Sequence, residues 1–204
     1  MVVADAANLA RLQGALDDLE AHVIAVPPFE SRFLQAGHAV HFRCRIPEAA
    51  GIRLDVMAKL RGLPDFETVW DRRTTVETPS AIIDVLSLPD LVTAKKTQRD
   101  KDWPMIARLV EAHYARHVQT PDDTLREFWL RELRSPTILI EVARSAPRLT
   151  ERLQASRPLL AHAMTGNESL LVAALQTEAE AEREADRVYW APLKRELGRL
   201  RESR

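Results

Sequence analysis

Apolar residues repeat at two different periods along this chain, and each period predicts a different kind of element. At the start, Leu9, Leu12 and Leu16 stand three or four residues apart, which predicts an amphipathic helix over residues 5–21. Asp5 precedes this segment and suits the N-cap, because its side chain can accept a hydrogen bond from the first helical turn. Beyond Pro27 the helical spacing gives way to alternation.

Strict alternation predicts two strands that pair as an antiparallel hairpin. Residues 38–45 and residues 52–57 both place an apolar side chain at every second position. The short connection between them contains Pro47 and Gly51, which favours a hairpin. The side chains expected to face the helices are Val40, Phe42, Leu54 and Val56.

The rest of the pattern completes an α+β fold. Residues 82–86 predict a third strand, and every segment from Pro89 onward has a helical pattern. The last, charged helix is expected to be kinked or broken at Pro192, because proline removes a helical hydrogen bond. We expect a small mixed or antiparallel sheet followed by helices, as an α/β domain over 1–118 and a helical C-terminal region over 119–204.

The composition limits the cellular compartments and the classes of partner that we expect for the chain. The 204 residues carry 29 basic and 30 acidic side chains, for a net charge of −1. No overall field therefore draws the chain to nucleic acid or membrane, and an anion site would need a local cluster. The single cysteine, Cys44, the lack of a long apolar run and the lack of a leader pattern predict a cytoplasmic protein without membrane association.

Asp55 is an isolated carboxylate on the polar side of the second strand, next to Arg53. One interpretation is a solvated strand residue or an ion-pair partner. The other is a ligand for Mg²⁺, which prefers carboxylate oxygen. A single carboxylate is a weak Mg²⁺ site, because phosphoryl-transfer sites use several to hold the metal against the substrate.

Lys95, Lys96, Arg99 and Asp102 fall within two helical turns. The structural interpretation is that the cations offset the negative end of a helix dipole. The functional interpretation is that Lys95 and Arg99, which lie on one helical face, contact nucleotide phosphates while Asp102 orients Arg99. Both interpretations remain open at this point.

Other familiar chemical motifs are missing from the sequence. There is no glycine-rich dinucleotide motif, no phosphate-binding Gly-Lys-Ser/Thr loop and no Gly-x-Ser-x-Gly nucleophile motif. His113 and His117 have the spacing of zinc ligands, but no Glu stands at the metalloprotease position between them and no third ligand follows. We expect no zinc site there.

As a set, these segments resemble the nucleotidyltransferase-like proteins of the DNA polymerase β superfamily. The resemblance covers about residues 5–115 and rests on the hairpin with Asp55, the strand-to-helix turn at Pro89-Asp90, and Lys95, Arg99 and Asp102. In that family a Gly-Gly or Gly-Ser turn precedes a strand with Asp-x-Asp, and a later strand supplies the third carboxylate. Asp55 matches this third position.

The resemblance implies Mg²⁺-dependent nucleotidyl transfer with Asp55 as catalytic residue and metal ligand, and with Lys95, Arg99 and Asp102 as the nucleotide-binding residues. The Gly-Ser turn and the Asp-x-Asp pair have no counterpart here, and the chain is expected to begin just after them. The alternative is a non-catalytic module that binds a partner protein or a nucleotide, for example as a toxin–antitoxin component. The partners left open are a nucleotide, another protein and a second copy of the chain. Some of the bacterial proteins of this fold that the chain resembles work in toxin–antitoxin pairs.

Overall fold

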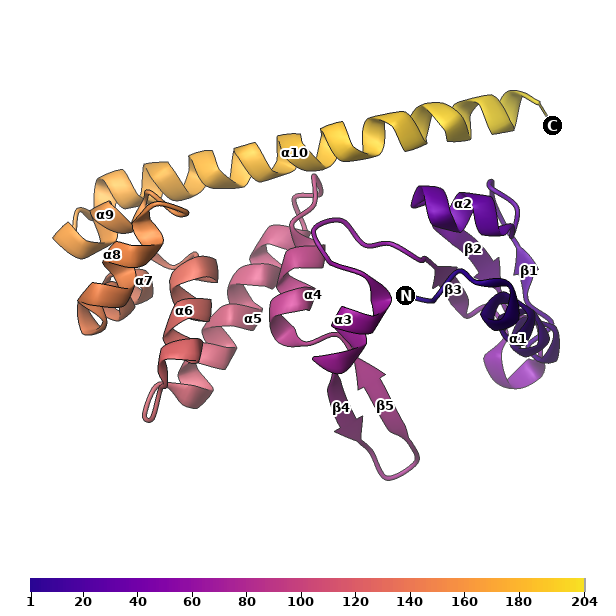
Figure 1. Cartoon of the computed structure of the whole chain (residues 1–204), viewed down its shortest axis with the longest axis horizontal. Coiled ribbons are helices and arrows are strands. Elements are labelled where there is room, and N and C mark those ends of the chain that lie inside the picture. Colours follow the sequence, from indigo (N-terminus) through magenta and orange to yellow (C-terminus); the bar gives the residue numbers. More distant parts are fainter. Residues whose placement is uncertain (204) are drawn as a thin grey trace. The chain divides into compact units, whose positions relative to one another are not determined.

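The chain folds into two compact units. In this computed structural model, which describes residues 1–203, unit 1 consists of Met1–Ser87 together with the chain from Val188 onward, and unit 2 consists of Leu88–Arg187. Helices and two small antiparallel sheets make up the molecule (Figure 1), which confirms the α+β fold class and the helical C-terminal region.

The first sheet of unit 1 contains the predicted hairpin. Strands β2 (Val40–Arg43) and β3 (Arg53–Val56) pair antiparallel, and the short β1 (His22–Val23) pairs with the other edge of β2. A 3-10 turn over Pro47–Ala49 lies in the connection between β2 and β3. In this register His41 lies opposite Asp55, so the two side chains share the polar face of the sheet.

The apolar face of this sheet packs against two helices, α1 (Ala6–Asp18) and α2 (Ser31–Ala36). As expected, the Asp5 side chain caps α1 by accepting a hydrogen bond from the backbone N–H of Asn8 at 2.8 Å. The small core is formed by Leu16, Leu34, Val40, Phe42 and Val56, with Leu54 partly buried against it. The predicted inward face of the hairpin is therefore confirmed.

A second, two-stranded sheet follows helix α3 (Phe66–Asp71). It pairs β4 (Thr74–Glu77) with β5 (Ile82–Val85) in an antiparallel register. The sequence predicted β5 but not β4. Every residue of the two strands is exposed, so this hairpin has no covered face.

Unit 2 is entirely helical from its first element, as the sequence predicts from Pro89 onward. Its core is built around Trp129, Ile106 and Leu139, which are almost completely buried. The helices that begin within this unit are α4 (Leu88–Lys95), α5 (Asp102–His117), α6 (Asp123–Glu132), α7 (Pro136–Ser145), α8 (Pro147–Gln154), α9 (Leu160–Thr165) and α10 (Glu168–Glu202).

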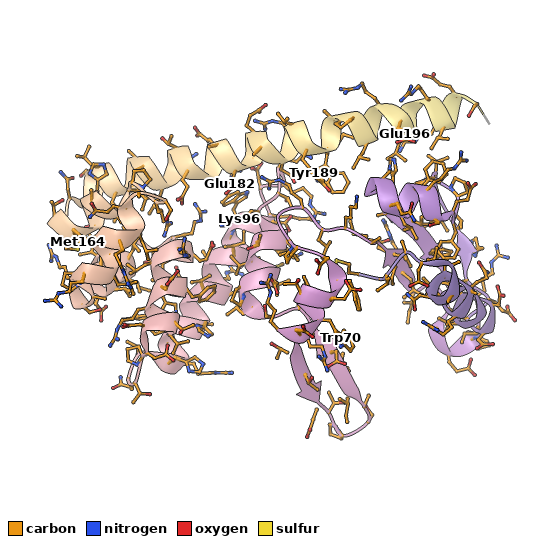
Figure 2. The ribbon with its side chains drawn as sticks, in the orientation of Figure 1. Trp70, Lys96, Met164, Glu182, Tyr189 and Glu196 are labelled. Carbon is orange, nitrogen blue, oxygen red and sulfur yellow. The ribbon has the colours of Figure 1, made fainter. Side chains whose placement is uncertain are left out.

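Helix α10 supplies residues to both units. Leu171 and Leu175 belong to the core of unit 2. In unit 1, Leu193 is buried and Glu196 meets the buried His38, with 2.8 Å between the carboxylate Oε2 and the ring Nε2. Tyr189 and Glu196 are seven residues apart, and they extend from the same side of the helix (Figure 2).

Of the two outcomes expected at Pro192, a kink or a break, the break is wrong, because α10 continues through this residue. Proline removes the hydrogen bond that the carbonyl of Val188 would otherwise accept. Val188 is 63% exposed, so water can satisfy that carbonyl and the helix tolerates the proline. Among the helices of residues 1–203, none combines the length and the apolarity needed to cross a membrane.

Candidate functional site

Asp55 lies on the outer, polar face of the β2–β3 hairpin, with 47% of its side chain exposed. Its Oδ1 is 2.7 Å from Nδ1 of His41 and accepts a hydrogen bond from Nε of Arg53 at 2.8 Å. The strand register fixes this trio, because His41 is directly opposite Asp55 and Arg53 is two residues away on the same face.

The surroundings of Asp55 keep it ionised. Desolvation acts to raise the pKa of Asp55, but the hydrogen bonds and positive charges of Arg53 and His41 outweigh it and hold the pKa below its usual value. One of its oxygens therefore already has two partners, which a metal ion would have to displace or share. Within residues 1–203, no three His, Cys, Asp or Glu side chains converge on a metal-sized site.

The second predicted site lies in unit 2, at the joint between α4 and α5. Asp102 is the first residue of α5, and its side chain is only 3% exposed. It accepts hydrogen bonds from Thr97 Oγ1 at 2.6 Å and from Arg99 Nε at 2.9 Å, and Lys95 Nζ lies 3.8 Å away. The structure thus brings Lys95, Arg99 and Asp102 together.

This cluster has the features of a structural clamp. Burial acts to raise the pKa of Asp102, yet the Thr97 hydrogen bond and the charges of Arg99 and Lys95 lower it overall. The carboxylate ties the end of α4 to the start of α5. The Arg99 side chain remains 58% exposed, so it can also meet an anion from solvent.

Lys96, next to this cluster, pairs with Glu132 of α6 at 2.8 Å. Asp55 belongs to unit 1 and has contacts of its own, whereas Lys95, Arg99 and Asp102 belong to unit 2. The two predicted sites are therefore two separate sets of contacts, each complete within its own unit.

His113 and His117 are part of the aromatic packing of unit 2. Trp129 donates a hydrogen bond from Nε1 to Nδ1 of His113 at 3.0 Å, and the two histidine rings are 4.7 Å apart. Burial lowers the pKa of His113, and the charges of His117 and Arg116 lower it further. A neutral His113 that accepts from Trp129 satisfies a polar group inside the helical core.

The β4–β5 hairpin carries an apolar surface that the sequence did not reveal. The register places Val76 opposite Ile83 and Thr74 opposite Val85, so these four side chains share one face. Val76, Ile83 and Val85 are 42%, 47% and 42% exposed. We call this surface the apolar hairpin face.

The opposite face of this hairpin carries Thr75, Glu77, Asp84 and the exposed Ile82, and its carboxylate Asp84 is tied to Arg73, just beyond the end of α3. Asp84 accepts a hydrogen bond from Thr75 Oγ1 at 2.6 Å and pairs with Arg73 at 3.0 Å. The Arg73 guanidinium lies 4.0 Å from the ring centroid of Trp70, which is at the base of the hairpin (Figure 2). Asp84 thus has partners on this second face, while all four residues of the apolar hairpin face are exposed.

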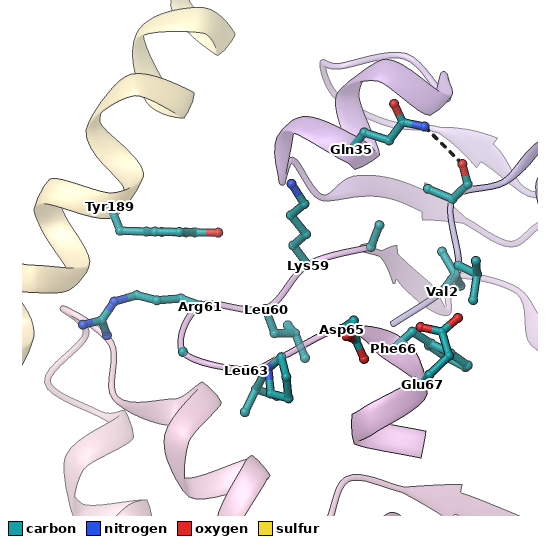
Figure 3. A pocket seen from close by; sticks show the side chains of 15 residues that line it. Val2, Gln35, Lys59, Leu60, Arg61, Leu63, Asp65, Phe66, Glu67 and Tyr189 are labelled. Carbon is teal, nitrogen blue, oxygen red and sulfur yellow. Dashed lines mark hydrogen bonds between the residues drawn. The ribbon is translucent and has the colours of Figure 1, made fainter. Parts of the chain in front are cut away.

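Unit 1 also contains an open cavity of about 580 Å³ that no local sequence pattern predicts (Figure 3). Its wall includes the loop from Ala58 to Asp65, the start of α3, and Tyr189 of α10. The Gly62-Leu63-Pro64 turn that shapes the loop is visible in the sequence, but Tyr189 is far away along the chain. Only the fold brings Lys59 and Tyr189 to the same cavity.

Comparisons of the chain with protein-family models, with curated proteins and with solved structures found no match.

Proposed function

We propose that this chain is a nucleotidyltransferase-like protein that acts by binding a second copy of itself through the apolar hairpin face, and not by catalysis. The observation that carries the proposal is the exposure of Val76, Ile83 and Val85 together on one face of a two-stranded ribbon. Isolated two-stranded hairpins are marginally stable in water, and a cover over the apolar face would stabilise this one.

A second copy suits this face because of its charge. The four residues of the apolar hairpin face, Thr74, Val76, Ile83 and Val85, are all uncharged. Two such faces can meet about a twofold axis without bringing like charges together, and the apolar side chains of each cover those of the other. The charged residues Asp84 and Arg73 are occupied on the opposite face.

The test is the oligomeric state of the full chain, measured by light scattering over a wide range of concentration. We expect a reversible dimer that the substitution Ile83→Lys abolishes, because a buried unpaired ammonium group is costly. The matched control is Ile52→Lys, since Ile52 is 52% exposed and lies outside the second hairpin. A monomer at every concentration, or equal loss of the dimer in both variants, would overturn the proposal.

Nucleotidyl transfer at Asp55 is a second candidate, favoured by one observation. Asp55 is a half-exposed carboxylate with a lowered pKa, so it is ionised at neutral pH and offers oxygen to a hard cation such as Mg²⁺. Transfer needs several groups to position the metal and phosphates, so we expect the chain to label no acceptor appreciably from a nucleoside triphosphate and Mg²⁺.

The two candidates differ in one measurement. Robust labelling of an acceptor that Asp55→Ala abolishes, with the dimer unchanged, would favour transfer over binding. A dimer without labelling would favour the binding module.

A further inference from the structure

We propose that the cavity between Lys59 and Tyr189 binds a small organic anion that has an apolar body. The cavity lies within unit 1, and its volume of about 580 Å³ is in the usual range for sites that bind small molecules. The ligand class follows from three features: two polar groups without partners, an apolar wall, and carboxylates that are occupied or located at the start of α3.

The anion end is formed by Lys59 and Tyr189. Among residues 1–203, neither the Lys59 ammonium nor the Tyr189 hydroxyl has a hydrogen-bond or ion-pair partner, and both side chains line the cavity. Figure 3 shows the Tyr189 ring extending from α10 toward Lys59. An ammonium and a hydroxyl on the same cavity can both donate to one carboxylate, sulfonate or phosphate group.

The Tyr189 hydroxyl lies beside Gly37, the residue that ends α2 with a φ of +105°. A side-chain Cβ atom at this glycine would be 3.5 Å from the hydroxyl oxygen. The nearby contact between His38 and Glu196 fastens the same stretch of α10 to unit 1. The hydroxyl therefore does not need to be ordered when a ligand binds.

The rest of the wall suits an apolar body. Leu60, Leu63 and Phe66 face the cavity, together with Val2 from the start of the chain. Gln35 is a polar member of the wall, but its amide already donates to Ser31 Oγ at 2.9 Å. An apolar ligand group that binds here would be removed from water, and the Gln35 amide would keep its hydrogen bond to Ser31.

The cavity wall also carries two carboxylates, and both come from the start of α3. Asp65 is the N-cap of α3 and accepts a hydrogen bond from the backbone N–H of Thr68 at 2.9 Å. Glu67 lies in the first turn of the same helix. Both acidic residues therefore come from the start of α3, whereas Lys59 precedes the turn at Gly62.

The experiment is a fluorescence titration of the full chain with 8-anilinonaphthalene-1-sulfonate, an anion with an apolar body. We expect saturable binding that Lys59→Glu weakens by about tenfold or more, because it replaces attraction with repulsion. Tyr189→Phe keeps the ring and should weaken binding by about threefold through loss of one hydrogen bond. Lys101→Glu makes the same change of charge at an exposed residue outside the cavity and should leave affinity within about twofold.

Competition identifies the chemistry of the anion. Octanoate and 1-naphthyl phosphate should both displace the probe if the shared requirement is a charge with an apolar body, and their relative strength tells carboxylate from phosphate. Inorganic phosphate should displace it poorly. The proposal fails if Lys59→Glu and Lys101→Glu bind alike, or if octanol displaces the probe as well as octanoate does.

Discussion

Asp55 and Asp102 make similar contacts in very different surroundings. Each carboxylate accepts a hydrogen bond from an arginine Nε, at 2.8 Å from Arg53 and at 2.9 Å from Arg99. Each has a pKa below the usual value. However, the Asp55 side chain is 47% exposed on a sheet, whereas that of Asp102 is 3% exposed at the joint of two helices.

An Asp–Arg pair in a sequence therefore does not by itself indicate a function. A buried carboxylate depends on its partners, because removing one partner leaves an uncompensated charge. A half-exposed one exchanges its partners for water at little cost. Asp102 is therefore committed to the fold, and Asp55 is the one available to a ligand.

We expect the largest effect on stability at a more extensive buried ion pair in unit 2, the pair between Arg157 and Glu178. Arg157 is 5% exposed, and it donates to both oxygens of Glu178 and to the carbonyls of Leu130 and Leu133. We expect Arg157→Met to reduce the free energy of unfolding by about 2–4 kcal/mol, because two helix-end carbonyls lose their donor and Glu178 keeps only its ion pair with Arg134 at 2.9 Å. Denaturation in urea measures this loss.

The control for Arg157 is Arg131, which pairs with Glu127 at 2.8 Å on the exposed surface of α6. Arg131→Met should cost less than about 1 kcal/mol. Equal losses in the two variants would mean that burial of the ion pair does not govern stability here.

The direct comparison is between Asp102→Ala and Asp55→Ala. We expect Asp102→Ala to reduce the free energy of unfolding by about 2–3 kcal/mol, since Thr97, Arg99 and Lys95 lose their shared acceptor. Asp55→Ala should cost less than about 1 kcal/mol. A loss for Asp55→Ala that equals or exceeds the loss for Asp102→Ala would reverse our assignment of the two sites.

The loss of stability at acid pH should depend more on Asp102 than on Asp55. The pKa values of Asp102 and Glu178 are lowered in the folded chain, in both cases against an opposing effect of burial. Between the folded and unfolded pKa values the unfolded state binds more protons, so this stability is present above about pH 4.5 and is lost as the pH falls. Urea denaturation between neutral and acid pH should show a shallower acid loss for Asp102→Asn than for Asp55→Asn.

The smallest effect is expected for the partners of Asp55. His41→Ala or Arg53→Ala should change the free energy of unfolding by no more than about 0.5 kcal/mol, and salt at about 1 M should remove most of that difference. Thermal unfolding with and without salt tests this. A salt-independent loss would indicate that the trio on the sheet is structural after all.

Much of the fold could be predicted because its signals are local. Alternation identified β2 and β3, and Asp5 was recognisable as the cap of α1. Strand β4 was missed because Thr74–Glu77 contains one strongly apolar residue, Val76, and packs on no core. Its pairing with β5 is the only reason that it is a strand.

The site could be predicted only in part, for a related reason. Lys95, Arg99 and Asp102 lie within a few residues of each other, so helical spacing was enough to bring them together. The burial of Asp102 results from packing within unit 2, and the spacing of residues in the sequence does not predict that packing. Lys59 and Tyr189 are brought to one cavity only by long-range folding, and no local pattern could have paired them.

Helix α10 also has a consequence for the order in which the chain is made. The contact between His38 and Glu196 joins residues 158 positions apart, and Tyr189 and Leu193 are likewise needed by unit 1. Unit 2 is one continuous stretch of sequence, so it can fold while the last residues of the chain are still being translated. The core of α1, α2 and the first sheet is translated early, whereas its contacts with α10 come more than a hundred residues later. During synthesis the His38 ring therefore lacks its Glu196 partner until the last part of α10 has been added.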